Sequence, residues 1–492
     1  MTFLLLLLLG LLTYTILQHS VARITRTPIW LLWLVMMTPA LFLSVWAAVA
    51  GDDGSVPAIV AVGVFVTCFV LYLWLLYLGR PTTSKTPVDR SSEVAGSVKT
   101  PPSPGNLISK LRPIAPSEES QLRNCFNWSV FVLQNLEYRP QAVICRGKLR
   151  TNPERAYQTI RQNVERQFGD RFLVVLQEGP NDRPLFVLAP NPQSKASPKS
   201  HTSSQNIWLA WGLFVITLFT TTVAGAEFVG LTAEQLQSEP GGLLRGLPYA
   251  LSLLAILGFH ESGHYFAARW HKIRTTLPYF IPIPFFLGTL GAFVQLRSPM
   301  PNRKVLFDIS VAGPIVGFLV TLPMLWWGLA HSEVVPASDQ SGLLNFNELQ
   351  PAVSLLLSLV CQFTLDGALD PQKAIDLHPV AISGYLGLIL TAFNLMPIGQ
   401  LDGGHMVHSM FGRRTALSIG QVTRFLMLML ALIHRELLLW ALLLFFMPLR
   451  DEPALNDVTE LDNKRDFLGL LCLALLAAVL LPAPRMLLAS LG

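Results

Sequence analysis

Phe259-His260-Glu261-Ser262-Gly263-His264 has the pattern H-E-x-x-H and lies inside a long apolar run, Leu247 to Ala268. Because a helix turns by about 100° per residue, residues four apart lie on one face, one turn apart. His260 and His264 can therefore both present an imidazole nitrogen to one metal ion, and Glu261 can take a proton from an attacking water. The alternatives are a chance match or two buried structural histidines. Ionisable side chains at membrane depth are costly unless they have a function, so we predict a metal site.

The composition is that of a protein with several membrane spans. Of the 492 residues, 51% are hydrophobic and only 14% are charged, which is typical of chains that cross a bilayer repeatedly. The net charge of +5 does not indicate nucleic-acid binding, because the basic residues lie in short loops and linkers. The five cysteines include no C-x-x-C pair. They indicate neither a disulfide framework nor a cysteine-bound zinc, so the metal must be held by histidine and carboxylate.

Three apolar runs open the chain and predict three membrane spans within residues 1–79: Phe3–Leu17, Ile29–Ala50 and Pro57–Leu78. The first run has neither a basic start nor a small-residue cleavage site, so we expect a retained span rather than a signal or transit peptide. Cations follow the first and third runs, and acids follow the second. Positive charge favours the cytosolic side, so we expect the N-terminus outside and the region after the third run in the cytosol.

A small soluble domain is expected between two linkers. Residues 80–121 are rich in Pro, Ser, Thr and Lys and predict a disordered linker, and residues 191–206 predict a second linker. Residues 122–190 predict a cytosolic α+β domain of order ββαββ. Its helix should span Pro153–Phe168, with Asn152 as N-cap. Its strands should span Trp128–Gln134, Gln141–Arg146, Arg171–Gln177 and Pro184–Leu188.

Residues 207–492 form the predicted core, which makes the chain an α-helical polytopic membrane protein of about nine or ten spans. The core's apolar runs are Ile207–Ala226, Leu247–Ala268, Val305–Ala330, Ile382–Met396, Ala416–Ile433, Leu437–Met447 and Phe467–Leu481. Ala352–Phe363 is a short amphipathic stretch in an external excursion. Tyr279–Val294 is also apolar, but prolines and glycines break it and cations flank both ends. It is predicted to be a re-entrant loop or hairpin beside the metal helix.

A catalytic zinc needs a third protein ligand and an open position. Asp402 is the only carboxylate between Asp376 and Glu436. It lies in the stretch Asn394-Leu395-Met396-Pro397-Ile398-Gly399-Gln400-Leu401-Asp402-Gly403-Gly404, whose proline and glycines break the helix and let side chains turn towards a cavity. We predict that Asp402 is the third ligand. An N-cap role for the same side chain is compatible with that role.

Three polar residues near Asp402 leave alternatives open. His405 or His408 could be the ligand in its place, or His405 could support the ligands; for His408, an interfacial position without a metal is the simpler interpretation. Asn394 could donate a hydrogen bond to a substrate carbonyl or a developing oxyanion. It could equally form an ordinary hydrogen bond between helices.

The two halves of this site, H-E-x-x-H in one span and N-x-x-P-x-x-x-L-D-G in a later one, resemble the site-2 protease family of intramembrane zinc metalloproteases. Gly147-Lys148-Leu149-Arg150 is similar to the G-N-L-R motif of the EGY-like branch of plastids and cyanobacteria, with Lys148 as a departure from it. Further stretches resemble the same branch: Leu290–Phe293, Asp308–Pro314, His378-Pro379 and Leu455–Glu460. The resemblance covers Asn124 to the C-terminus and not the first three spans.

The resemblance implies that His260, His264 and Asp402 bind zinc and that Glu261 is catalytic. It implies a metalloendopeptidase that hydrolyses membrane-anchored protein substrates within or beside their transmembrane helix. The expected partners are those substrates and the lipid bilayer, without nucleic acid. The expected location is multi-pass in a plasma or thylakoid membrane.

Two other classes of function compete with proteolysis. A catalytically silent metal-binding membrane regulator would need no base, so the intact Glu261 argues against it. A metal-ion transporter would need a polar path beyond the site, and Leu247–Gly258 offers no ionisable residue for one.

Overall fold

The computed structural model describes residues 28–50, 114–139, 142–179, 183–191, 207–232, 238–283, 287–337, 345–365, 373–433, 437–447 and 453–484, and single residues 14, 67, 68, 71, 75 and 235. The chain divides into two compact units, Met1–Thr100 and Pro101–Gly492. In the first, the predicted span Ile29–Ala50 is helix α2. The predicted spans Phe3–Leu17 and Pro57–Leu78, apart from single residues, and most of both predicted linkers lie outside the described residues.

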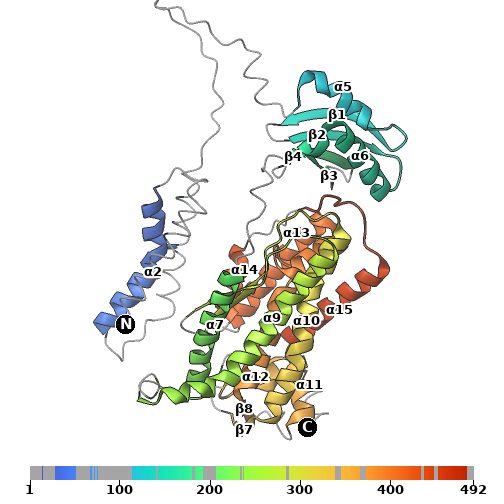
Figure 1. Cartoon of the computed structure of the whole chain (residues 1–492). Helices are drawn as coiled ribbons and strands as arrows, with labels where there is room; N and C mark the ends of the chain where they lie inside the picture. The colour runs from blue at the N-terminus through green and yellow to red at the C-terminus, as the bar shows by residue number, and fades with distance from the viewer. Residues whose placement is uncertain are drawn as a thin grey trace, which may run out of the picture. The chain divides into compact units, whose positions relative to one another are not determined.

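The predicted α+β domain is present with the predicted order of elements (Figure 1). Its four strands form one antiparallel sheet of order β1-β2-β4-β3. The sheet is formed by β1 (Phe131–Arg139), β2 (Ala142–Leu149), β3 (Phe172–Glu178) and β4 (Pro184–Pro190), with helix α6 (Pro153–Phe168) and the 3-10 turn η2 (Gly169–Arg171) between β2 and β3.

Helix α6 has the bounds predicted for it, because local signals fix both ends. Asn152 accepts a hydrogen bond from the backbone N–H of Glu154 at 2.9 Å, and Pro153 takes the first helical position. Gly169, with φ of 59°, ends the helix. One face of the helix is buried against the sheet, through Ala156, Tyr157, Ile160 and Val164.

Two details of this domain differ from the prediction. Trp128 lies in a turn, and β1 starts three residues later, at Phe131. Ile114 is buried in the domain core, and the 3-10 turn η1 (Pro116–Glu118) and helix α5 (Glu119–Cys125) follow it. Residues 114–121 therefore belong to the folded domain and not to a linker, because Ile114 buries apolar surface there.

The G-N-L-R-like stretch lies at the end of a strand. Gly147, Lys148 and Leu149 end strand β2. A Cβ at Gly147 would lie 2.2 Å from the carbonyl oxygen of Val132 on β1, so the close pairing of the two strands requires glycine there.

The core contains ten helical elements among the described residues. They are α7 (Ile207–Phe228), η5 (Pro240–Gly246), α9 (Leu247–Trp270), α10 (Arg303–Ala330), α11 (Leu355–Thr364) with η6 (Pro351–Val353) before it, α12 (Pro379–Leu395), α13 (Asp402–Ile433), α14 (Leu438–Phe446) and α15 (Asn463–Leu480). Helix α10 packs against α9, α12 and α13, and α9 also packs against α12. These four helices bring together segments far apart in the sequence.

Three helices in the described part of the chain are long and apolar enough to cross a membrane: 207–228, 240–270 and 303–330. The predicted count of about nine or ten spans is therefore not confirmed. Helix α12, predicted as a span, has 17 residues, which is shorter than a typical span of about 20 residues. Its side chains are largely buried against other helices.

Two small sheets accompany the helices. Residues 279–293 form an antiparallel hairpin of β5 (Tyr279–Pro282) and β6 (Thr289–Phe293), and β7 (Glu333–Pro336) pairs with β8 (Lys373–Asp376). The β5–β6 hairpin lies beside α7, where Thr220 Oγ1 donates to the carbonyl oxygen of Gly288 at 2.7 Å. The hairpin shape agrees with one of the two predicted shapes, and its depth in a membrane stays a prediction.

Candidate metal centre

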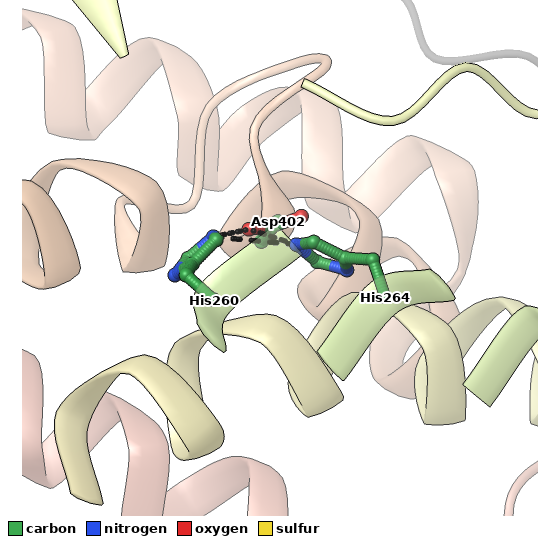
Figure 2. A group of neighbouring side chains, drawn as sticks. All are labelled: His260, His264 and Asp402. Atoms are coloured by element: carbon green, nitrogen blue, oxygen red, sulfur yellow. Dashed lines mark hydrogen bonds and ion pairs between the residues drawn. The ribbon is translucent and has the colours of Figure 1, made fainter. Parts of the chain in front are cut away.

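The three predicted ligands meet although they come from two helices. His260 and His264 lie on α9, and Asp402 is the first residue of α13. The two histidine Nε2 atoms are 3.3 Å apart. Asp402 Oδ2 is 3.5 Å from His260 Nε2 and 3.2 Å from His264 Nε2 (Figure 2). Within the part of the chain that the structure describes, this is the group that could hold a metal ion.

The donor atoms of this group fit zinc. A tetrahedral zinc ion with bonds of about 2.0–2.1 Å needs donor atoms about 3.3–3.4 Å apart, and the three observed separations lie around that value. Two imidazoles and one carboxylate leave a fourth position for water or substrate. That donor set is typical of catalytic zinc sites, whereas structural sites are closed by four protein ligands.

Helix α10 orients His264. The Nδ1 atom of His264 is 2.8 Å from the carbonyl oxygen of Ile309. A carbonyl oxygen only accepts hydrogen bonds, so Nδ1 carries the proton and the lone pair of Nε2 faces Asp402. A hydrogen bond of this kind fixes both the tautomer and the ring orientation of a metal-binding histidine.

Two glycines of α10 make room for the histidine rings. A Cβ at Gly313 would lie 2.1 Å from His264 Nε2, and a Cβ at Gly317 would lie 2.9 Å from His260 Nδ1. The glycines have the same four-residue spacing as the two histidines. They therefore form a flat face on α10 that matches the ligand face of α9.

Glu261 is buried beside the ligands, with 9% of its surface exposed. The backbone N–H of Val294 lies beside its carboxylate. Val294 follows β6 directly, so the end of the β5–β6 hairpin lies beside the residue predicted to carry protons.

The remaining predicted residues separate into two groups. Asn394, in the last turn of α12, places its Nδ2 atom 3.2 Å from His260 Nε2 and so lies at the edge of the metal group. His405 and His408 lie on α13 and are not part of the metal group found among the described residues. His408 is buried and donates from Nε2 to Asp457 Oδ1 at 2.9 Å.

The sequence matches the profiles of two known protein families. The profile of peptidase family M50 matches residues 248–434, and the profile of the EGY3 middle domain matches residues 120–196. The probable zinc metalloprotease EGY2, chloroplastic, of Arabidopsis thaliana is 31% identical over 372 residues, which are 73% of this chain and 63% of that protein. The chain belongs to peptidase family M50, in its EGY-like branch.

Two further relatives from Arabidopsis thaliana show the same pattern. The probable zinc metalloprotease EGY1, chloroplastic, is 30% identical over 70% of this chain and 66% of its own length. The probable zinc metallopeptidase EGY3, chloroplastic, is 25% identical over 72% of this chain and 64% of its own length. The chain thus spans just under two thirds of the length of these curated relatives. No solved structure matches it.

The M50 match covers all five residues that the sequence analysis placed at the site, namely His260, Glu261, His264, Asn394 and Asp402. Sequence reasoning did not find the residues that support them. The carbonyl of Ile309 and the N–H of Val294 are backbone groups and have no residue-type signal. Gly313 and Gly317 could have been found from the sequence, because their four-residue spacing is the same as that of the two histidines.

Proposed function

We propose that this M50 family member is an intramembrane zinc metalloprotease that hydrolyses peptide bonds of membrane-anchored proteins, within or beside their transmembrane helix. The observation that carries this proposal is the meeting of His260 and His264 with Asp402, next to the buried carboxylate of Glu261. A closed structural site needs no such base, and a silent regulator would gain nothing from it.

Each residue has a separate task in this mechanism. His260, His264 and Asp402 would hold the zinc ion, which supplies Lewis acidity for activating water and polarising a carbonyl. Glu261 would accept the proton of the attacking water and pass it to the leaving amine. The N–H of Val294, which lies beside the Glu261 carboxylate, would orient it for this transfer.

Asn394 is the candidate donor to the developing oxyanion. Its amide group lies 3.2 Å from His260 Nε2, so it reaches the edge of the metal group without being a ligand. Donors placed at such a position stabilise charge that develops only during the reaction.

The β5–β6 hairpin is the element that we propose to receive the substrate. A transmembrane substrate must unwind before its carbonyl can be attacked, because helical carbonyls are already hydrogen-bonded. An unwound strand can pair with a free strand edge. On β6, Leu290 is 71% exposed and Phe293 is 46% exposed, so apolar side chains are available to such a strand beside Glu261. In this proposal the hairpin re-enters the membrane next to α9.

The site is proposed to lie within the membrane, nearer its cytosolic side, with the α+β domain on that side. Trp208 at the start of α7 and Trp270 at the end of α9 are 86% and 85% exposed, and tryptophan favours the membrane interface. Arg269, Lys272 and Arg274 lie at the same end of α9. The membrane itself is the plasma or thylakoid membrane in this proposal, and the number of spans is about nine or ten.

The test is the Glu261→Gln variant, which keeps the size of the side chain and removes the base. Membrane-protein fragments from cells with either chain are compared by mass spectrometry, and zinc is measured in both purified proteins. Fragments should be present with the wild type and absent with the variant at equal zinc content. Glu165→Gln, on the exposed face of α6, is the matched control and should leave the fragments unchanged. Equal fragments from the Glu261→Gln chain would contradict the proposal.

A further inference from the structure

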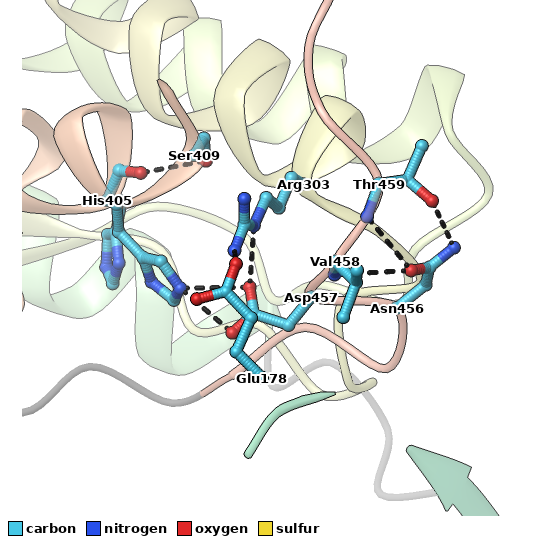
Figure 3. A network of polar contacts seen from close by, with 9 residues as sticks. Glu178, Arg303, His405, Ser409, Asn456, Asp457, Val458 and Thr459 are labelled. Atoms are coloured by element: carbon cyan, nitrogen blue, oxygen red, sulfur yellow. Dashed lines mark hydrogen bonds and ion pairs between the residues drawn. The ribbon is translucent and has the colours of Figure 1, made fainter. Parts of the chain in front are cut away.

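A second polar network lies away from the metal group, and the mechanism does not use it. Arg303, the first residue of α10, is 3% exposed and donates from Nε to Asp457 Oδ1 at 3.1 Å. Its second bond reaches Glu178 Oε1 of the α+β domain at 3.2 Å. His408 of α13 binds the same Asp457 carboxylate, at 2.9 Å and 3.2 Å from its two oxygens. Figure 3 shows the contacts of Arg303 with Asp457 and Glu178. Asp457 thus joins three parts of the protein.

The backbone around Asp457 reinforces this junction. Leu455–Asp457, here called the clamp segment, forms parallel bridges with Leu176 of β3 on one side and Asn302 on the other. Leu176 N–H donates to Leu455 O at 2.7 Å, and Asp457 N–H donates to Leu176 O at 2.9 Å. On the other side, the N–H groups of the clamp segment donate to the carbonyls of residues 300 and 301 at 2.8 and 3.0 Å. The segment therefore connects the domain sheet to the start of α10.

Both helices that meet at Asp457 also shape the metal group. On α10, Arg303 lies six residues before Ile309, whose carbonyl orients His264. On α13, His408 lies six residues after Asp402. Six helical residues span about 9 Å, so the network lies a similar distance from the metal group along each helix. The relative position of α10 and α13 thus contributes to the distance between the Asp402 carboxylate and His264, whose ring α10 orients.

The same network holds the α+β domain in its seat, by which we mean the pairing of β3 with the clamp segment and the contact of Glu178 with Arg303. Arg303, Asp457 and His408 are at most 3% exposed, and a buried charge that loses a partner is strongly destabilised. If β3 moved away, Arg303 would lose Glu178 and the clamp segment would lose the hydrogen bonds on one side. Asp457 would then be held less firmly, and so would the two helices that it joins.

We propose that the network Glu178–Arg303–Asp457–His408 couples seating of the α+β domain to the geometry of the zinc site, with Asp457 and His408 as positioning residues. The inference rests on the proposed function, because it concerns the zinc-binding residues assigned there. A partner or substrate segment that draws β3 away from the clamp segment weakens zinc binding. By the same coupling, zinc strengthens the seating of the domain, since coupling between two sites is reciprocal.

The first test measures zinc affinity of the full chain by chelator competition. Glu178→Ala changes a residue of the soluble domain, yet it should lower zinc affinity at least about fivefold. Glu154→Ala is the matched control, because Glu154 also pairs across to α10, with Lys304 at 3.8 Å, but lies outside the network. It should leave zinc affinity unchanged. His408→Ala should also weaken binding, and the double variant with Glu178→Ala should lose less than the two single losses combined.

The second test measures hydrogen exchange of the Leu176 amide, which donates to the clamp segment. Zinc should slow this exchange in the wild type and should no longer do so in Asp457→Asn, a response that a purely structural ion pair does not produce. Unchanged zinc affinity in Glu178→Ala, together with exchange that does not respond to zinc, would overturn the coupling. A wild-type chain that binds no zinc would instead overturn the proposed function and this inference with it.

Discussion

Gly313 of α10 lies against the ring of His264, so closely that a Cβ at residue 313 would be 2.1 Å from Nε2. The ring is also held at both nitrogen atoms, because Nδ1 is bonded to Ile309 O and Nε2 faces Asp402. The absence of a side chain at this position is therefore a requirement of the metal group.

Gly313→Ala should weaken zinc binding about tenfold to a hundredfold, the range known for residues that support metal ligands. The added methyl group must displace the imidazole or push α10 away from α9. Zinc affinity of the purified variant, measured by chelator competition, checks this. Gly212→Ala in α7 is the control, because a Cβ there meets nothing within 4 Å. Equal zinc affinity in the Gly313 variant would show that the ring is not confined as described.

Asp402→Ala should leave the purified protein with little zinc, because two histidines alone form an incomplete site. His405→Ala should keep its zinc, since His405 is outside the metal group of the described residues. Metal analysis of both proteins after one buffer exchange separates the two cases. A full zinc content in the Asp402 variant, with loss in the His405 variant, would move the third ligand to His405.

Asn394→Ala should lower kcat about a hundredfold to a thousandfold, the effect expected for loss of one oxyanion donor, and should keep zinc. The control is Thr391→Val, one turn earlier on the same buried helix, whose hydroxyl donates to Gly387 O of its own helix. Cleavage kinetics with a single identified substrate provide the comparison. If the two variants are equally active, Asn394 serves only as a contact between helices.

Gly288→Ala should lower kcat/KM with zinc retained, since the hairpin would lose its seat on α7. A Cβ at Gly288 would lie 2.4 Å from Thr221 Cα, and the φ of 79° is itself unfavourable for alanine. Gly241→Ala, with open space around the residue, is the control. Turnover that stays at the wild-type level would remove the hairpin from the substrate path.

Cysteine labelling tests the proposed sides of the membrane. On a background without the five native cysteines, single cysteines replace the exposed residues Glu239, Glu333 and Lys148. An impermeant maleimide added to intact cells should label positions 239 and 333 and should reach position 148 only after lysis. Rapid labelling of position 148 in intact cells would place the α+β domain outside.

The predictable parts of this protein were those with local signals. Pro153–Phe168 was predicted with its true bounds because the cap residue, the proline and the glycine all lie in the sequence beside the helix ends. The proposed metal-binding pair, His260 and His264, followed from a spacing that one helix turn explains. Asp402 was identified as the lone acid of a long apolar region, and the structure brings its carboxylate to the pair.

What could not be predicted depends on contacts between distant segments. His408 and Asp457 are 49 residues apart. Neither residue type predicts that the two side chains will pair. Every residue has a backbone carbonyl, so nothing in the sequence marks the carbonyl of Ile309. Only the fold brings it to His264. The start of β1 was placed too early because Trp128 and its neighbours are apolar enough for a strand, whereas the chain uses them in a turn.

The division of the metal group between α9 and α13 has a consequence during protein synthesis. His264 leaves the ribosome about 140 residues before Asp402, which is roughly 7–28 s at about 5–20 residues per second. During that interval the nascent chain carries two histidines and a base but lacks the carboxylate. Under the proposed function, the nascent chain therefore cannot cleave any peptide bond until Asp402 has been made and α13 has packed against α10.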